Sequence, residues 1–148
     1  MTEFSELSLD EVLSNFELFD EWEDKYVYLM ELGKKLPPLA PEDKSETNRI
    51  HGCQAEVWVK TDFDEKSPST MSLSGDSNSA IVKGLVAVVI LIFSGLPANQ
   101  VATTNEKPVF TRLGLDQYLS PTRKVGLASM VKTIKVIAGT KASQDTSQ

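Results

Sequence analysis

A long apolar stretch between Ala80 and Phe93 constrains the fold more than any other part of this sequence. It has 14 residues, and Lys83 is its only charged side chain. A helix that spans a bilayer needs about 20 apolar residues, so this stretch is too short to cross a membrane. Apolar residues occupy nearly every side of the helix that it would form, which is typical of a buried helix. We therefore predict a central core helix over residues 79–93, ended by Gly95.

Two amphipathic helices are predicted before this core helix. Ser8 begins the first, because a serine followed three residues later by Glu11 has the pattern of a capping box. The second begins at Asp20-Glu21-Trp22-Glu23 and ends near Gly33, before Pro37-Pro38. Both carry apolar residues at helical spacing on one face: Leu9, Val12, Leu13, Phe16 and Phe19 in the first, and Trp22, Tyr26, Leu29, Leu32 and Leu36 in the second.

Residues 54–74 have the pattern of an antiparallel hairpin. Apolar and polar residues alternate from Gln54 to Thr61, which is typical of a strand. A polar turn at 63–68 separates it from a return strand at 69–74. The segment Gly75-Asp76-Ser77-Asn78 is expected to break that strand and to offer caps for the core helix. The segment around Ile50 is a candidate third strand.

Short helical turns and one long helix are predicted after the core helix. The short turns lie near 98–101 and 113–119. Ser120-Pro121 begins the long helix, because a capping residue precedes a proline at the first helical position, and Gly139 is expected to end it. This order of elements predicts an α+β fold, a small antiparallel β-sheet packed against several α-helices. The 148 residues fit a single domain, with flexible ends at 1–7 and 140–148.

Charge and composition exclude several classes of function. The net charge is −6, and residues 1–46 hold 13 acidic residues against four lysines. This acidic region either steers a basic partner or is a solvated helix surface. The sequence has no basic patch, so we expect no nucleic-acid partner. We see no signal peptide and no membrane anchor, and a lone cysteine fits a reducing compartment, so we predict a cytoplasmic protein. The absence of heptads favours a monomer.

Cys53 is the only cysteine, which limits what it can do. It can form no intramolecular disulfide, and zinc would need more Cys or His ligands than the chain has. No phosphate-binding glycine loop is present. A Cys–His pair with His51 is sterically feasible on an extended segment, yet no third group is evident to orient the ring. Two readings stay open: a small buried hydrophobe, or a thiol on a turn at Gly52 that reacts with a partner.

Five separate stretches resemble the SufE family of sulfur acceptors in their order and spacing. Together they cover nearly all of residues 8–138. They are Trp22-Glu23-x-Lys25-Tyr26-x-Tyr28, Glu31-Leu32-Gly33-x-x-Leu36-Pro37, Asn48-x-Ile50-x-Gly52-Cys53-Gln54-x-x-Val57-Trp58, Gly75-Asp76-Ser77-x-x-Ala80-Ile81-Val82-Lys83-Gly84-Leu85 and Leu119-Ser120-Pro121-x-Arg123-x-x-Gly126-Leu127.

The resemblance implies a sulfur carrier with a SufE/IscU-like fold. Its partner would be a cysteine desulfurase that uses pyridoxal phosphate and holds sulfur as a persulfide. Cys53 would take that sulfur, stimulate the desulfurase by doing so, and pass the sulfur to a scaffold or acceptor for iron–sulfur cluster assembly. The chain would be an accessory protein, not a standalone enzyme, with no cofactor or metal of its own. The alternative is a non-catalytic activator that only binds the desulfurase.

The resemblance also implies roles for particular residues. Cys53 is expected on a loop tip, partly shielded in an apolar pocket, which would protect a persulfide. Arg123 is expected near this loop, where it would either stabilise the thiolate or simply cap a helix or pair with a carboxylate. Asp76 would help to cap the core helix or contact a partner. IscU-type scaffolds share the architecture but use several cysteines, so this chain should not hold a cluster in the same way.

Overall fold

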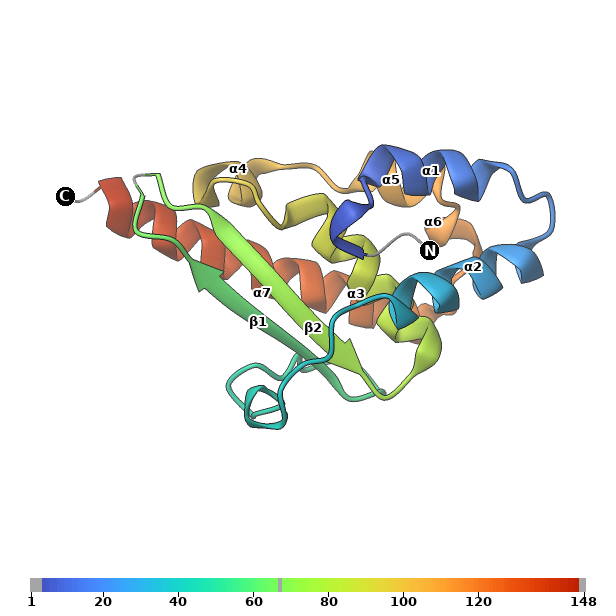
Figure 1. The fold of residues 1–148 in the computed structure, drawn as a ribbon, viewed down its shortest axis with the longest axis horizontal. Coiled ribbons are helices and arrows are strands. Elements are labelled where there is room, and N and C mark those ends of the chain that lie inside the picture. Colours follow the sequence, from blue (N-terminus) through green and yellow to red (C-terminus); the bar gives the residue numbers. More distant parts are fainter. Residues whose placement is uncertain (1–3, 67, 147–148) are drawn as a thin grey trace.

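The computed structural model describes residues 4–66 and 68–146 as an α+β fold (Figure 1), which confirms the predicted class. Its sheet has two antiparallel strands. In chain order the elements are η1 (Phe4–Glu6), α1 (Leu9–Glu17), α2 (Trp22–Lys34), η2 (Pro41–Asp43), β1 (Val57–Phe63), β2 (Met71–Ser77), α3 (Ala80–Phe93), α4 (Ala98–Thr103), α5 (Lys107–Arg112), α6 (Leu115–Tyr118) and α7 (Pro121–Thr146).

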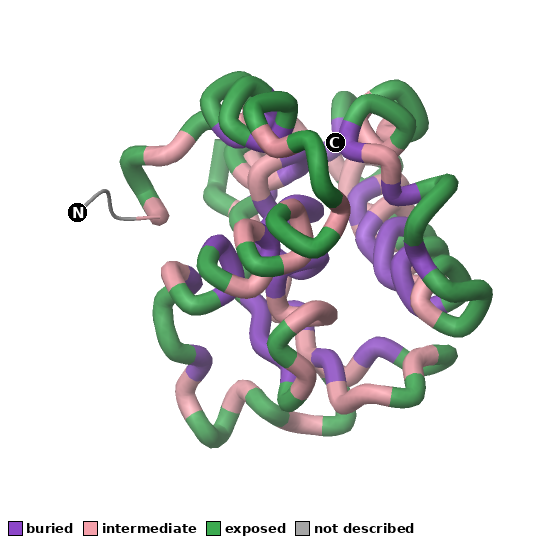
Figure 2. The backbone as a smooth tube through the Cα atoms, turned by 90° about the vertical axis from the view of Figure 1, so that its right-hand side faces the viewer, coloured by how far each residue is buried: buried purple, intermediate pink, exposed green. Residues whose placement is uncertain are grey.

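Helix α3 is the central buried helix, as predicted. Ser79 caps it, because the Ser79 hydroxyl accepts a hydrogen bond from the Val82 N–H at 3.4 Å. Nine of its 14 residues are buried, which explains why its sequence is apolar on all sides. Helix α2 and strand β2 make its most extensive contacts, and Figure 2 shows buried positions gathered in the interior of the molecule. None of the helices in the described ranges is both long and apolar enough to span a membrane.

The hairpin is confirmed, but both strands lie further along the chain than expected. Val57 and Val59 face the core, as the alternation predicted. The prediction that residues 75–77 break the second strand is wrong, because Gly75 pairs with Val59 inside β2. A Cβ atom at position 75 would lie 2.7 Å from a methyl carbon of Val86, so the glycine permits close packing on α3. The third strand is not formed: the segment makes an isolated bridge between Arg49 and Trp58.

Helix α7 runs along the length of the molecule (Figure 1) and is longer than predicted. It begins at Pro121 as expected, but it continues through Gly139 to Thr146, so the predicted end is wrong. The Asp145 carboxylate accepts hydrogen bonds from the Ser69 N–H and hydroxyl, each at 3.1 Å, which ties the helix end to the hairpin. Of the ends predicted to be flexible, residues 1–3 and 147–148 lie outside the described residues.

The remaining helices pack around this core: α1 contacts α3, whereas α4, α5 and α6 contact α7 or one another. The Ser8 hydroxyl caps α1 by accepting from the Glu11 N–H at 3.1 Å, as the sequence pattern predicted. Between α3 and α7 the chain forms α4, α5 and α6, whereas only two turns were expected there. Helix α4 packs along α7, and α5 packs on α6. These contacts leave the first half of α7 beside the loop that carries Cys53.

Candidate functional site

Cys53 lies on an irregular loop before β1, as predicted. Gly52 precedes it with a φ of +92°, a conformation that side chains rarely adopt, so a glycine is needed to turn the chain here. The loop is held at both ends by backbone hydrogen bonds. One hydrogen bond joins its two ends: the Ile50 N–H, before the loop, donates to the Val57 carbonyl, after it, at 2.8 Å. The cysteine itself is half-buried and free.

The first turns of α7 receive this loop, and Gly126 is the point of closest approach. A Cβ atom at position 126 would lie only 2.9 Å from the Cys53 Sγ, so the sulfur sits against bare helix backbone. The Ser129 hydroxyl donates a hydrogen bond to the His51 carbonyl. Two contacts one helical turn apart therefore hold the cysteine loop on α7.

Cys53 and Arg123 open into the same cavity of about 360 Å³, which we call the cysteine pocket. Its wall is mixed: Val82, Leu85, Leu127 and Met130 are apolar, whereas Ser79, Ser120, Thr122 and Arg123 are polar. The Arg123 N–H donates to the Ser120 hydroxyl at 3.3 Å at the start of α7. Within the described ranges the Arg123 guanidinium forms no ion pair, so the expected alternative of a carboxylate partner is not observed.

Burial raises the pKa of the Cys53 thiol above its ordinary value. The physical cause is loss of hydration, which disfavours the charged thiolate. At neutral pH the thiol is therefore mostly protonated in this conformation and is a weak nucleophile. Reaction requires a change around the sulfur, by a cation or by movement of the loop toward water.

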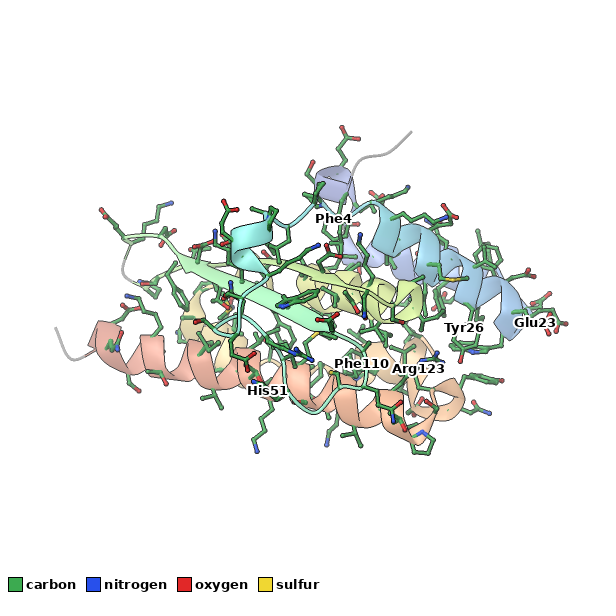
Figure 3. The ribbon with its side chains drawn as sticks, turned by 90° about the horizontal axis from the view of Figure 1, so that it is seen from below. Phe4, Glu23, Tyr26, His51, Phe110 and Arg123 are labelled. Carbon is green, nitrogen blue, oxygen red and sulfur yellow. The ribbon has the colours of Figure 1, made fainter. Side chains whose placement is uncertain are left out.

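The His51 ring contacts Glu46, although Cys53 is only two residues away in the sequence. The ring Nε2 lies 2.9 Å from a carboxylate oxygen of Glu46, and both side chains are exposed. The turn at Gly52 breaks the extended geometry on which a Cys–His pair would depend. Figure 3 labels His51 and Arg123 and shows that they come from different elements, the loop and the start of α7. The His51 ring thus contacts the Glu46 carboxylate at the surface, and this geometry gives no support for a Cys–His pair.

Asp76 has a structural role, because it holds neighbouring elements together. It lies in β2, and its carboxylate contacts Lys44 and Lys83, each at 3.3 Å. Burial tends to raise its pKa, but the hydrogen bond from the Ser77 N–H and the two lysines outweigh burial and lower it. The expectation that Asp76 caps the core helix is wrong, since Ser79 does so. Asp76 instead ties the strand to α3 and to the loop before β1.

The described residues contain no cluster of three or more His, Cys, Asp or Glu side chains that could hold a metal ion. Two residues that shape the site were missed from the sequence. Gly126 lies in the last of the five family stretches, which predicts no role for it, and Ser129 lies just outside that stretch. Their spacing from Arg123, three and six residues along a helix, places all three near one face, and this signal was available.

Two comparisons with known proteins match most of this chain. The family model for SufE, described as an Fe-S metabolism associated domain, matches residues 10–138. An uncharacterised SufE-like protein of Rhizobium etli is 43% identical over 138 residues, which is 92% of this chain and 93% of that protein. The matched region includes the hairpin, the cysteine loop and most of α7.

Proposed function

Because this chain belongs to the SufE family, a family of Fe-S metabolism, we propose that Cys53 accepts persulfide sulfur from a cysteine desulfurase. The single observation that carries the proposal is the placement of the only cysteine, on a loop and in one pocket with Arg123. A thiol used for exchange needs access to its partner and a means to ionise. The loop offers the first. Since burial raises the pKa of the thiol in this conformation, the second would come from the Arg123 guanidinium in the same pocket or from the partner, once the loop moves.

The proposed step moves one sulfur atom and needs no outside oxidant or reductant. The Cys53 thiol first loses its proton to solvent or to a group of the partner. The thiolate then attacks the outer sulfur of the desulfurase persulfide, a new S–S bond forms at Cys53, and the old S–S bond breaks. Its electron pair stays on the desulfurase cysteine, which leaves as a thiolate. Clearing that cysteine would stimulate the desulfurase, and the sulfur on Cys53 would pass on for iron–sulfur cluster assembly.

The cysteine pocket suits this cargo. Its cavity of about 360 Å³ leaves room beside the Cys53 sulfur for a second sulfur atom. Partial burial would slow attack by reductants and oxidants on a persulfide held there. A free Cys53 thiol, ready to accept sulfur, is what a reducing compartment maintains, which agrees with the cytoplasmic location that we predict.

Intact mass measurement tests the proposal. After incubation with the cognate desulfurase, pyridoxal phosphate and cysteine, the wild-type chain should gain about 32 Da, the mass of one sulfur atom, and lose it on reduction. Cys53→Ser should gain nothing, and because there is no other cysteine a gain on that variant would contradict the proposal. The wild type should also raise desulfurase turnover, and Cys53→Ser should not.

A second function is a desulfurase activator that binds without accepting sulfur. One observation favours it: the raised pKa of Cys53 and its close contact with Gly126 are also what a packing role would produce. In that case Cys53→Ser would stimulate the desulfurase fully, and the wild-type chain would gain no mass.

A further inference from the structure

A second, larger cavity lies beside the cysteine pocket, between α5–α6 and the outer face of α7. Its volume is about 770 Å³, and we call it the α7 groove. Its apolar wall is formed by Phe110, Leu115, Leu119, Leu127, Val131 and Val136. Phe110 is labelled in Figure 3. Leu127 also lines the cysteine pocket, so the groove and the pocket adjoin across one helical turn.

Helices α5 and α6 cover this face of α7 only in part: Leu127 and Val131 are buried, and Lys135 of α7 pairs with Glu106 at the start of α5, whereas Val136 stays exposed. Helix α7 makes its main contacts with α4, whereas α5 makes its contacts with α6. Val136 on the wall of the groove is 59% exposed, which is high for an apolar side chain. Apolar surface of this kind in a groove is typical of a site that binds a partner.

The charges around the groove are unlike those of the whole chain. Four lysines border it, although the chain has a net charge of −6. Lys135 pairs with Glu106 at 3.2 Å, whereas Lys107, Lys124 and Lys132 form no ion pair with any described residue. Apart from Glu106, the only carboxylate on the lining is Asp116. The groove therefore combines an apolar wall with uncompensated positive charge.

We propose that the α7 groove binds an amphipathic helix of a partner protein, with acidic residues beside the apolar face of that helix. Helix-in-groove recognition uses apolar anchors about one turn apart, as Leu127 and Val131 are on α7, and the exposed Val136 extends the apolar lining further along the helix. From Lys124 to Val136 this lining is about 18 Å long, at 1.5 Å per residue, which matches roughly three turns of a bound helix. Acidic residues of the bound helix meet Lys107, Lys124 and Lys132, which supplies orientation and faster association.

The position of the groove would place the bound partner next to Cys53, whether or not Cys53 carries sulfur. A helix seated against Leu127 stands next to the cysteine pocket. The partner is then held beside the cysteine loop without contact to the sulfur itself. The inference does not depend on sulfur transfer, because it rests on the shape and the charge of the groove.

Two synthetic peptides of about 18 residues test the proposal with the full-length chain. They share one apolar helix face of leucine and phenylalanine and differ only in flanking residues, glutamate in one and lysine in the other. Backbone amide shifts of the ¹⁵N-labelled chain locate the binding, and fluorescence anisotropy gives the affinity. We expect the acidic peptide to bind at α5, α6 and α7 at least tenfold more tightly than the basic one. Salt should weaken that binding, because exposed charges are screened.

Matched variants separate the groove from general effects of charge. Lys124→Glu with Lys132→Glu should weaken the acidic peptide by about tenfold or more, whereas Lys35→Glu with Lys66→Glu, the same change of charge elsewhere, should not. Val136→Ser should weaken the binding of both peptides, because both use the same apolar face. Val27→Ser is its control, because Val27 is also exposed on a helix, at 52%, away from the groove.

Each other outcome overturns the proposal. Amide shifts only outside the groove would contradict it, and so would equal affinity of the two peptides. Equal effects of a groove variant and its control on peptide binding would contradict it as well. If laurate binds in the groove and neither peptide does, the site takes a fatty acid and not a helix. If the groove resonances move with protein concentration alone, the occupant is a second copy of this chain.

Discussion

At residue 126 of α7, the absence of a side chain lets the Cys53 sulfur lie against the helix backbone. A Cβ atom there would be 2.9 Å from Sγ, closer than such atoms normally approach. Helix α7 is held by buried neighbours of this position, Leu127 and Met130, so the Cys53 side chain or its loop must shift. We predict that Gly126→Ala displaces Cys53 toward water, lowers its pKa toward the ordinary value and speeds its alkylation by iodoacetamide several-fold at pH 7.5.

The same helix provides a matched control at Gly139. A Cβ atom at position 139 would meet only the Cβ of Ala102, at 4.0 Å, an ordinary contact. Gly139→Ala should therefore raise helix stability by about 0.5–1 kcal/mol and leave the alkylation rate unchanged. Equal alkylation rates for Gly126→Ala and the wild type would show that Gly126 does not set the position of the sulfur.

The pH dependence of alkylation reports the ionisation of Cys53 directly. Burial raises its pKa, so the thiolate fraction at neutral pH is below that of a free cysteine. The alkylation rate should rise with pH and reach half its maximum above about pH 8.5, the ordinary thiol value. If Arg123 stabilises the thiolate, Arg123→Gln moves the midpoint further up and Arg123→Lys restores most of the shift. Lys124→Gln, on the next residue, is the control, and identical profiles for Arg123→Gln and the wild type would refute the role.

Only some of these site residues could be predicted from the sequence. Cys53 stands out because it is unique, and Arg123 could be named only through the resemblance to a family. The contact of Gly126 with the sulfur depends on how the loop crosses α7, which no local pattern encodes. His51 was judged from an extended segment, and the positive φ of Gly52 removes that geometry.

Among the elements, the junction of β2 with α3 is held by an ion cluster around Asp76. Lys83 of α3 and Lys44 of the preceding loop each lie 3.3 Å from its carboxylate, which is largely buried. The pKa of Asp76 is lowered, because the Ser77 N–H and the lysines favour the ionised form more than burial disfavours it. A lowered folded-state pKa means that the ionised carboxylate adds stability above the unfolded value, about 3.9. That stability is lost as the pH falls below this value and through the folded-state pKa.

We predict that Asp76→Asn lowers the free energy of unfolding at pH 7 by about 1.5–3 kcal/mol, the range for hydrogen bonds to a charged group. The difference from the wild type should shrink as the pH falls below about 4, the ordinary carboxyl value, and on through the lowered folded-state pKa, as the wild-type carboxylate becomes protonated. Urea unfolding at these pH values measures both effects. Asp62→Asn is the control, because Asp62 is exposed on the same hairpin. A difference that stays constant with pH would mean that Asp76 acts by packing and not by charge.

Element boundaries show where local sequence signals lose to tertiary contacts. The core helix was predicted to within one residue, since its apolar run and its serine cap are both local. The sequence predicts that Gly75 breaks the strand, yet Gly75 lies within β2. The strand packs so closely on Val86 there that no side chain would fit, which explains the glycine. Gly139 reads as a helix end, yet the helix continues because α4 packs along α7. In both cases a packing partner distant in sequence decides the outcome.

At the scale of the whole molecule, α7 joins the cysteine pocket at one end to the hairpin at the other. Arg123 and Gly126 lie in the first turns of α7, and Asp145 accepts hydrogen bonds from Ser69 in the last turn of the helix. The 22 residues from Arg123 to Asp145 rise about 33 Å along the helix. The two ends should therefore respond to mutation independently, because additivity holds for sites far apart with no shared partner.

Asp145→Ala tests this independence. It removes the carboxylate that accepts two hydrogen bonds from Ser69, so we predict a loss of about 1.5–3 kcal/mol in the free energy of unfolding. Gln144→Ala removes an exposed neighbour on the same helix turn and should change stability little. Urea unfolding measures the loss, and iodoacetamide alkylation of Cys53 should keep its wild-type rate in both variants. Faster alkylation in Asp145→Ala alone would mean that the end of α7 is coupled to the cysteine loop through the helix, because no described contact joins Asp145 to that loop directly.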